Sequence, residues 1–290
     1  MGKEVRLVEW IKNMNSVLNY IEDNLKSDID LVIIEKKAGC SIYNFQRIFS
    51  FLTGVSLAEY IRRRRMTKAA FEIQHTNTKI GEIGSQYGYE AAASFNRAFQ
   101  SVHEVSPIRA REEGIKLNCY PKISFSLSVK GDESMKYRIE SRTHMRVIGV
   151  RTELVEDAEE NEKIVPRFWS KTLESAAFKE LLEIESIEPK GILGITVYNN
   201  PNDIFYYIAV ASNSEKPDGL CELVIPEAKW VIFENDGYFP ESIQTIYKRF
   251  LTEWLPFSGY EWAEKPDIEV YPVSNSKLQK GHSEVWIAIK

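Results

Sequence analysis

The sequence predicts an all-α domain with two helix-turn-helix units, followed by an α+β domain in which the order strand-helix-strand-strand occurs twice. The first half of this prediction rests on a repeat. A Phe-x-Arg-x-Phe segment at residues 45–49 returns at residues 95–99, each time within an amphipathic helical pattern. The prediction of the α+β domain rests on a change in the sequence pattern after residue 115, where short segments alternate apolar and polar residues.

Length and composition limit the class of protein. With 290 residues, 43% hydrophobic and 27% charged, the chain can form two ordinary domains. No apolar run reaches the length of a membrane span and the start lacks a signal peptide's apolar core, so we expect a cytoplasmic protein without a membrane partner. The three cysteines and four histidines are scattered, which predicts no disulfide framework, no metal site and no cofactor.

Charge is distributed unevenly along the chain. Residues 1–115 hold 16 Lys and Arg against 14 Asp and Glu, whereas the remainder holds 21 against 28. A basic cluster, Arg62-Arg63-Arg64-Arg65 with Lys68, is the kind of surface that binds phosphates. The alternative is a solvated helix face. The acidic C-terminal half predicts a domain that stays off nucleic acid and attracts cations.

The first helix-turn-helix unit is predicted from its caps and its apolar stripe. Asp30 is an N-cap for a helix that ends at Ala38-Gly39, and the next helix carries Phe45, Ile48, Phe49 and Leu52 on one face. Its opposite face presents amide and guanidinium groups, which read purine edges in a DNA major groove: Tyr43, Gln46 and Arg47.

The second unit repeats this arrangement. A helix beginning at the Ser56-x-x-Glu59 capping box joins the units and carries the arginine cluster. A short helix near Ile83 turns at Gly88 into the helix with Phe95 and Phe99 inside. The outer face of that last helix includes Ala93, Asn96 and Arg97.

These segments resemble the AraC/XylS family of bacterial transcription regulators, in its compact MarA- and Rob-like subgroup. The matching text is at residues 45–49, 54–57, 60–62, 65–69, 83–89, 95–99 and 106–107. The resemblance implies two recognition helices in successive major-groove segments. It places Tyr43, Gln46 and Arg47 at base edges in the first helix, and Ala92, Ala93, Asn96 and Arg97 in the second.

The sequence departs from the family at several of these positions. Relatives often have Trp at the position of Tyr43, amides at Ala92 and Ala93, and Gly at Glu104. The second helix has therefore lost hydrogen-bonding groups, so its readout depends on Asn96, Arg97 and methyl contacts. Phosphate contacts are expected from Arg62, Arg63 and Arg64.

From residue 116 to 134 we expect a linker, with strand periodicity starting at Ile123, Phe125, Leu127 and Val129. The second domain, residues 135–290, is predicted to contain strands at 137–140, 146–152, 191–198, 203–211, 228–235, 267–271 and 283–289. Helices are expected at 162–184 and 240–255. Taken as two repeats, these elements form an α+β domain with a pseudo-twofold axis and a central groove.

This half resembles the GyrI-like effector-binding domain. The matching text is at residues 237–238, 253–256, 258–260, 267–271 and 284–287. The family places an acidic ligand contact at Glu269. Strand alternation puts Glu269 beside Tyr271, and Glu284 beside Trp286. A carboxylate among aromatic rings attracts a lipophilic cation. The alternative is that each glutamate is a half-exposed strand residue bonded to a neighbour. Further walls of the groove are expected from Trp169, Tyr198, Tyr207 and Tyr238.

We therefore expect a one-component transcription regulator and not an enzyme. Its partners would be double-stranded DNA, a small-molecule effector and RNA polymerase. The open alternative is that the C-terminal domain hydrolyses small electrophiles with a Glu and a Tyr, as some GyrI-like proteins do. The sequence contains no nucleophile-base pair, P-loop or metal signature for other catalysis.

Overall fold

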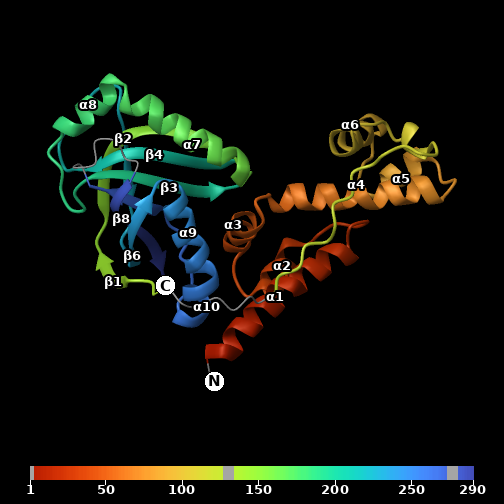
Figure 1. Cartoon of the computed structure of the whole chain (residues 1–290), viewed down its shortest axis with the longest axis horizontal. Coiled ribbons are helices and arrows are strands. Elements are labelled where there is room, and N and C mark those ends of the chain that lie inside the picture. The colour runs from red at the N-terminus through yellow and green to blue at the C-terminus, as the bar shows by residue number, and fades with distance from the viewer. Residues whose placement is uncertain (1–2, 127–133, 273–279) are drawn as a thin grey trace. The chain divides into compact units, whose positions relative to one another are not determined.

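The computed structural model describes residues 3–126, 134–272 and 280–290. It contains two compact units, the first made mainly of residues up to Ser128 and the second mainly of residues from Val129 onward. Each unit is described by itself. Figure 1 shows a helical unit and a unit built on a sheet, which confirms the predicted fold class.

The helical unit contains both predicted helix-turn-helix pairs. The first pair is α2 and α3, the second is α5 and α6, and α4 joins them. The bounds are α1 (Lys3–Asp23), α2 (Leu31–Ala38), α3 (Ile42–Thr53), α4 (Leu57–His75), α5 (Ile80–Gln86), α6 (Ala92–His103) and a 3-10 turn η1 (Arg109–Arg111).

Local chemistry explains where these helices begin and end. The Asp30 side chain accepts a hydrogen bond from the Val32 amide, and Ser56 caps α4 through the Glu59 amide. Gly39 ends α2 at φ 72°, where a side chain would be strained. Glu104 occupies the same left-handed region at the end of α6, with φ 63°, and this is a position where the resemblance led us to expect glycine.

The two phenylalanine pairs form the interior of the helical unit. Phe45 and Phe49 stack with ring centroids 6.0 Å apart, and Phe95 and Phe99 lie 5.8 Å apart. All four side chains are buried. The repeated Phe-x-Arg-x-Phe pattern therefore places its phenylalanines inside and its arginines on the other face of each helix.

The segment that follows η1 has no helix or strand through residue 126. The strand expected from Ile123 is therefore not formed at residues 123–126, and Leu127 and Val129 lie outside the described residues. Side chains of α1 and α4 occupy the backbone groups that a strand would have paired, for example the Phe125 amide, which donates to Asn15 Oδ1.

The second unit is an eight-stranded antiparallel sheet with the order β1-β6-β8-β7-β3-β4-β2-β5. Its strands are β1 (Tyr137–Arg142), β2 (Met145–Leu154), β3 (Ile192–Asn200), β4 (Asp203–Ala211), β5 (Cys221–Ile225), β6 (Ala228–Tyr238), β7 (Asp267–Tyr271) and β8 (Lys280–Ile289). Its helices are α7 (Ala158–Leu173), α8 (Ala176–Glu183), α9 (Glu241–Arg249), a π-helical turn η2 (Phe250–Trp254) and α10 (Leu255–Ser258).

The strand order reveals the predicted duplication. The order β6-β8-β7 on one side mirrors β2-β4-β3 on the other, and the two halves meet where β3 pairs with β7. Helices α7 and α8 lie between β2 and β3 in the chain, and α9 lies between β6 and β7. The centre of the sheet is thus the seam between two strand-helix-strand-strand repeats.

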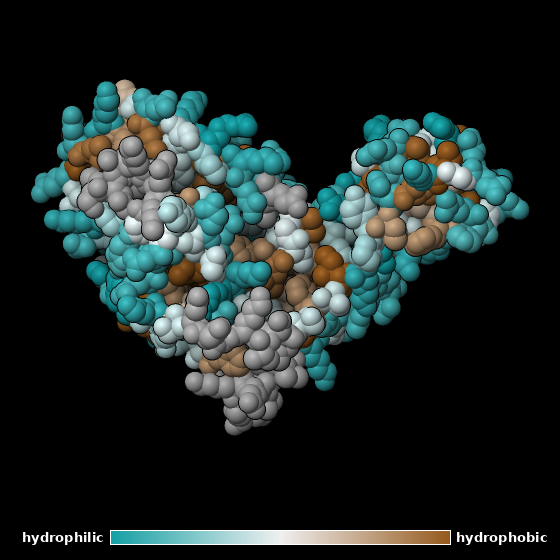
Figure 2. Space-filling view, in the orientation of Figure 1, coloured by the Kyte–Doolittle hydropathy of each residue, from teal (hydrophilic) through white to brown (hydrophobic). Residues whose placement is uncertain are grey.

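Two apolar clusters occupy opposite faces of the sheet. One contains Ile148, Ile192, Tyr206 and Ile208, packed against Phe168 and Trp169 of α7. Figure 1 shows α7 and α8 lying along this side. The other cluster contains Trp230, Ile268 and Trp286. Figure 2 shows a mostly hydrophilic visible surface with separate apolar patches.

Two details of the second unit differ from the expectation. The single helix expected over 162–184 is two helices, because Ser175 interrupts it and caps α8 through the Phe178 amide. Strand β5 was not expected. Its sequence, Cys-Glu-Leu-Val-Ile, ends in three consecutive apolar residues and so shows no regular alternation.

Candidate functional site

The exposed surface of α6 carries the side chains that were expected at base edges. Ala92, Ala93, Asn96 and Arg97 are exposed, while Phe95 and Phe99 anchor the opposite face. Arg97 bonds only weakly along its own helix, with Nη2 3.3 Å from Ser94 Oγ. Its guanidinium is therefore available to an acceptor outside the chain.

The corresponding face of α3 carries Tyr43, Gln46 and Arg47, all partly exposed. Arg47 Nη1 donates to the Tyr43 hydroxyl at 3.2 Å, and its guanidinium lies 5.3 Å from the centre of the Tyr43 ring. This arrangement orients the planar guanidinium of Arg47 on the tyrosine ring.

Arg62 and Arg63 lie on the surface of α4 and share one carboxylate. Arg62 binds both oxygens of Glu59 at 2.7 Å, and Arg63 Nε donates to Glu59 Oε1. Both arginines remain about one-third exposed. The cluster is thus partly neutralised by Glu59.

Arg64 does not lie with them on the outer side of α4, which corrects the expectation for this residue. Its side chain is 8% exposed and forms a two-bond ion pair with Glu22 of α1, at 2.7 and 2.8 Å. It also donates to the Tyr120 carbonyl. Burial acts to raise the pKa of Glu22, but the bonds and charge of Arg64 outweigh it and the pKa is lowered. Successive helix positions point in different directions, so four consecutive arginines cannot share one face.

A cavity in the α+β unit lies over the seam between the two repeats. Its walls include residues of α7, β3, β4, β7 and α9. The residues that matter to its chemistry are Trp169, Thr196, Tyr206, Phe239, Glu269 and Tyr271. The rings meet edge to face, with Trp169 5.4 Å and Phe239 5.0 Å from Tyr271. Helices from both repeats therefore enclose one aromatic site.

Glu269 is the carboxylate in this cavity. Its Oε2 accepts from the Tyr206 hydroxyl at 2.7 Å and from the Tyr271 hydroxyl at 2.9 Å. The Trp169 indole in turn donates to the Tyr206 oxygen at 3.0 Å. Oε1 accepts from no other residue in the described parts of the chain. One oxygen is thus fixed by protein donors and the other remains for a ligand.

Burial sets the protonation of this group. Desolvation raises the pKa of Glu269, although the two tyrosine bonds act in the opposite direction and nearby Asp267 adds to the rise. The pKa values of Tyr206 and Tyr271 are raised, first by burial and then by the charge of Glu269. Both tyrosines therefore remain protonated donors toward the carboxylate.

Gly194 provides the space for this group. It lies on β3 directly opposite Glu269 of β7. A Cβ at this position would lie 2.2 Å from the Tyr206 hydroxyl oxygen and 2.6 Å from Glu269 Oε2. Any side chain there would displace the hydrogen-bonded pair.

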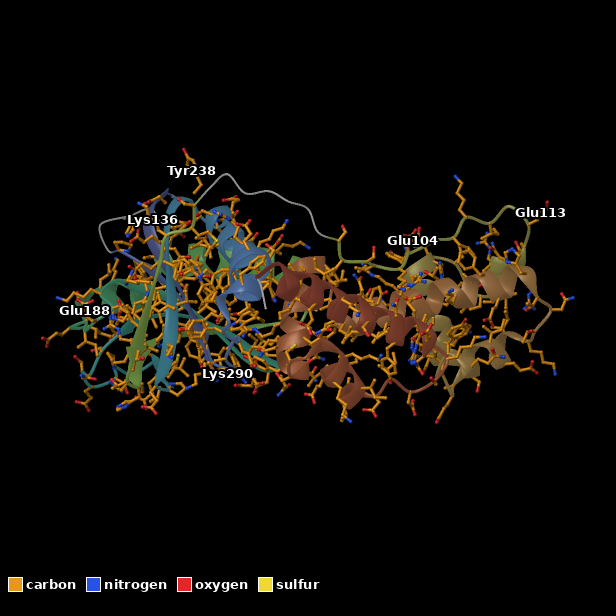
Figure 3. All side chains as sticks on the ribbon, turned by 90° about the horizontal axis from the view of Figure 1, so that it is seen from below. Glu104, Glu113, Lys136, Glu188, Tyr238 and Lys290 are labelled. Carbon is orange, nitrogen blue, oxygen red and sulfur yellow. The ribbon has the colours of Figure 1, made fainter. Side chains whose placement is uncertain are left out.

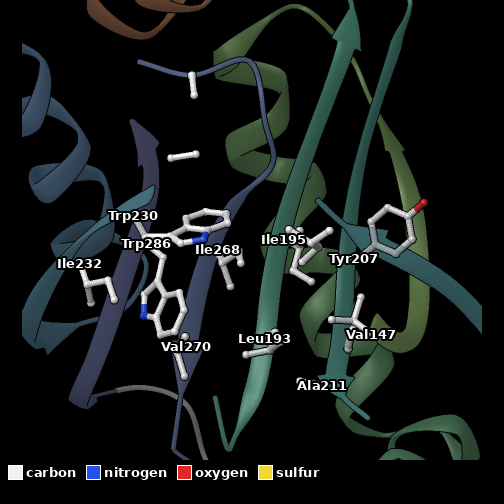
Figure 4. Packing of buried hydrophobic residues seen from close by; sticks show 14 residues of the cluster. Val147, Leu193, Ile195, Tyr207, Ala211, Trp230, Ile232, Ile268, Val270 and Trp286 are labelled. Atoms are coloured by element: carbon white, nitrogen blue, oxygen red, sulfur yellow. The ribbon is translucent and has the colours of Figure 1, made fainter. Parts of the chain in front are cut away.

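The expectation that Glu284 and Trp286 stand beside Glu269 is wrong. In the antiparallel register, Glu269 pairs with Val285 while Val270 pairs with Glu284, so the two glutamates point to opposite faces of the sheet. Glu284 forms a two-bond ion pair with Arg138 at 2.7 and 3.0 Å and accepts from the Trp286 indole. Figure 4 shows Trp286 packed in the other cluster with Trp230, Ile268 and Val270.

The expected tyrosine walls are also distributed differently. Tyr207 lies in that same opposite cluster (Figure 4), and Tyr198 is not among the residues lining the cavity. Tyr238 is 64% exposed and projects from the domain in Figure 3. Of the eight expected ligand residues, the structure brings together Glu269, Tyr271 and Trp169.

Two cavity residues were not expected from the sequence, Tyr206 and Phe239. β4 is apolar along nearly its whole length and buried on both faces, so alternation could not decide between Tyr206 and Tyr207. Phe239 follows the matched Gly237-Tyr238 pair and enters the cavity where its neighbour Tyr238 turns outward.

The described residues show neither a membrane span nor a metal cluster. No helix among them combines the length and the apolar character needed to cross a membrane. No group of three or more His, Cys, Asp or Glu residues in these parts of the chain is arranged to hold a metal ion.

Comparison with known proteins matches each unit separately. Residues 138–289 match the family described as integron-associated effector binding protein, and residues 34–113 match a helix-turn-helix domain family. The TetD protein of transposon Tn10 from Escherichia coli is 43% identical over 94 residues, which are 32% of this chain and 68% of TetD. The multiple antibiotic resistance protein MarA of Escherichia coli K12 is 36% identical over 98 residues, 34% of this chain and 77% of MarA.

Solved structures similar to the second unit include SAV2435 bound to tetraphenylphosphonium, with a TM-score of 0.49 and 17% identity, covering 54% of this chain and 94% of that one. An integron cassette protein from Vibrio cholerae has a TM-score of 0.39 and 16% identity, covering 53% and 95%.

The fold, the two family matches and the similarity to MarA define a DNA-binding regulator of the AraC type with a C-terminal effector-binding domain of the GyrI-like kind. Through residues 138–289, more than half of its length, the chain belongs to the integron-associated effector binding protein family.

Proposed function

We propose that this regulator senses a lipophilic aromatic cation in the cavity around Glu269, and that the bound cation changes how the helical unit acts at DNA. The observation that carries the proposal is the state of the Glu269 carboxylate. One of its oxygens is held by two tyrosine hydroxyls, the other is left for a ligand, and aromatic rings surround both. Charge and cation–π attraction both favour a cation there.

The same geometry favours a cation over an anion or a neutral sugar. Tyr206 and Tyr271 already donate to Glu269, so their hydroxyls offer little to an anion. The rings of Trp169, Phe239 and Tyr271 supply apolar contact area. A ligand that is both flat and positively charged satisfies the carboxylate and covers the rings.

The test is titration of the full chain with a panel of aromatic quaternary ammonium ions and neutral analogues of the same size. Trp169 is the expected fluorescence reporter because its indole bonds to Tyr206. Glu269→Gln keeps the shape and removes the charge, so it should weaken cation binding about tenfold or more, which is about 1.4 kcal/mol. Glu284→Gln, on the opposite face, is the control. Equal affinity of wild type and Glu269→Gln across the panel would refute the cation site.

For DNA, we propose that α3 and α6 enter successive major-groove segments. The base-edge contacts are assigned to the outward residues of the two helices, Tyr43, Gln46, Arg47, Ala92, Ala93, Asn96 and Arg97. Arg62 and Arg63 are assigned to phosphates, against competition from Glu59.

Arg47→Ala and Arg97→Ala should each weaken binding to a selected duplex by about 1–3 kcal/mol and relax readout at a few base pairs. Binding-site selection from random DNA supplies the duplex and reads the change in preference. Wild-type affinity and specificity in both variants would contradict the recognition-helix assignment. We also propose RNA polymerase as a further partner and the cytoplasm as the location of the protein.

A second candidate function is hydrolysis of small electrophiles by the C-terminal domain. It is favoured by the same carboxylate with its two tyrosines, since Glu269 can act as a base and the tyrosines as acids. Turnover of activated esters and epoxides by the purified chain separates the candidates. Turnover that Glu269→Gln abolishes would support the hydrolase, and binding without turnover would support the sensor.

A further inference from the structure

We propose that residues 118–125, hereafter the strap, are a working part of the DNA-binding unit and fix the separation of its two recognition helices. A linker between domains would leave its backbone to solvent. Here polar groups along the strap bond in turn to α6, to α4 and to α1. The proposal builds on the assignment of α3 and α6 to the DNA.

At its beginning the strap is attached to the second helix-turn-helix unit. Asn118 Nδ2 donates to the Val102 carbonyl at 2.8 Å, at the end of α6. This carbonyl belongs to the last turn of the helix, where no further helical amide can reach it. The Asn118 side chain therefore caps the C-terminal end of the second recognition helix.

In its middle the strap crosses α4. The Tyr120 amide donates to Thr67 Oγ1 at 3.1 Å, and the Tyr120 carbonyl accepts from Arg64. Thr67 and Arg64 are both buried, so these bonds are shielded from water. The Tyr120 ring covers the Arg63 guanidinium at 4.9 Å. Both backbone groups of Tyr120 are thus fixed by the helix that joins the two units.

At its end the strap is attached to α1 and so to the first unit. Asn15 forms two bonds with the Phe125 backbone, donating to its carbonyl at 2.8 Å and accepting from its amide at 2.9 Å. Lys122 bonds to Asn19, and the Phe125 ring meets Trp10 edge to face at 6.5 Å. The Asn15 side chain thus pairs with both the amide and the carbonyl of Phe125, as the backbone of a neighbouring strand would.

These three attachments span the whole helical unit, because α6 is the second recognition helix, α4 joins the two units, and α1 packs against α2 of the first unit. The direct contact between the two helix-turn-helix units is small and polar. Lys26, which follows α1, donates to Gln86 Oε1 of α5 at 2.9 Å, and its ammonium lies 5.2 Å from the centre of the Tyr87 ring. Such exposed pairs contribute little to rigidity. A strap bound to both ends supplies what these pairs do not.

The consequence concerns the DNA. Two recognition helices on one rigid body tolerate only one distance between their target segments, whereas two loosely joined units tolerate several. The strap should therefore set how strictly the protein requires one spacing in its operator.

The test uses the full chain and the duplex that the wild type selects from random DNA. Copies of this duplex carry one or two extra base pairs between the two recognised segments. Asn15→Ala/Asn118→Ala should bind the original duplex about tenfold more weakly and lose less affinity than wild type on insertion. Asn24→Ala, which removes a bond from Asn24 Nδ2 to the Tyr20 carbonyl inside the first unit, is the matched control.

If the double variant does not fold, judged by circular dichroism, Thr67→Val replaces it, because it removes only the acceptor of the Tyr120 amide. The same shift in spacing preference is then expected at smaller size. A wild-type preference that the strap variants keep unchanged would overturn the proposal. Failure of the wild type to prefer any duplex would instead be a failure of the recognition-helix assignment, so the two results are distinguishable.

Discussion

Gly194 shows how the absence of one side chain creates the room in which a charged group is held. Gly194→Ala would place a methyl group within 2.2 Å of the Tyr206 hydroxyl and displace the Glu269 pair. We expect cation binding to fall at least tenfold, measured by Trp169 fluorescence. Gly81→Ala is the control, because the added methyl there meets nothing within 4 Å. Unchanged affinity in Gly194→Ala would show that the pair can relocate without loss.

The raised pKa of Glu269 gives a second prediction at this scale. The ionised carboxylate attracts a cation, so affinity should fall as pH drops through the raised pKa, by up to about tenfold per pH unit. Calorimetry in buffers of different ionisation enthalpy should detect proton release on binding. Glu269→Gln should remove this pH dependence, and a variant that retained it would assign the proton to another group.

The stability of the folded protein depends on pH in the opposite direction to the affinity for a cation. A carboxyl whose folded pKa is raised above 4.5 favours the folded protein while it is protonated. That contribution is fully present below the unfolded pKa and is lost as pH rises through the folded pKa. The site therefore reduces the stability of the free protein at neutral pH, as an uncompensated ligand contact does.

At the scale of elements, the Glu22–Arg64 pair joins α1 to α4. Arg64→Met leaves a buried carboxylate without its partner and should lower the free energy of unfolding by about 3–5 kcal/mol. Denaturant unfolding measures this. Arg97→Ala, on an exposed position of α6, should change stability little. The double variant Glu22→Met/Arg64→Met should recover much of the loss, and no recovery would mean that the bond to Tyr120 carries the stability.

Most elements could be predicted from the sequence because their signals are local. Caps at Asp30 and Ser56 and the two phenylalanine stripes fix the helices of the first unit. The duplication was visible in the order of strands and helices. The break at Ser175 was not visible, because the apolar pattern continues across it.

The cavity could be predicted only in part, because its composition depends on pairing between distant strands. Alternation within β7 correctly placed Glu269 with Tyr271, but it says nothing about which face of β8 joins them. The register between β7 and β8 moved Glu284 and Trp286 to the other face. Because β4 is buried on both faces, the sequence did not show which of its two tyrosines faces the cavity, and Tyr207 was predicted in place of Tyr206. The role of Arg64 likewise could not be predicted locally, because its partner Glu22 lies forty-two residues away along the chain.

At the scale of the whole molecule, the proposed cation can regulate through DNA affinity only if the two binding events influence each other. If a bound cation changes the affinity for DNA by some factor, bound DNA must change the affinity for the cation by the same factor, typically between about 5 and 150. Titrating the cation with and without the selected duplex, and the duplex with and without the cation, measures both. Equal affinities in all four titrations would mean that the cation acts after DNA binding, through contact with polymerase.

The unequal charge of the two halves of the chain fits DNA binding by the first half and cation binding by the second. The first 115 residues carry a small positive excess, although three of the clustered arginines are paired with glutamates, and the rest of the chain is acidic. Salt should therefore weaken both DNA binding and cation capture, each through its own charges.

The position of the cavity over the β3–β7 seam has a consequence for how ligand preference can evolve. Trp169, Gly194 and Tyr206 come from one copy of the duplicated unit, and Phe239, Glu269 and Tyr271 come from the other. The carboxylate therefore comes from one copy, while the other copy contributes an indole ring and a hydroxyl donor. Under the proposed function, substitutions confined to the copy that contains Trp169 and Tyr206 can thus alter which molecules are recognised without removing the carboxylate that favours a cation.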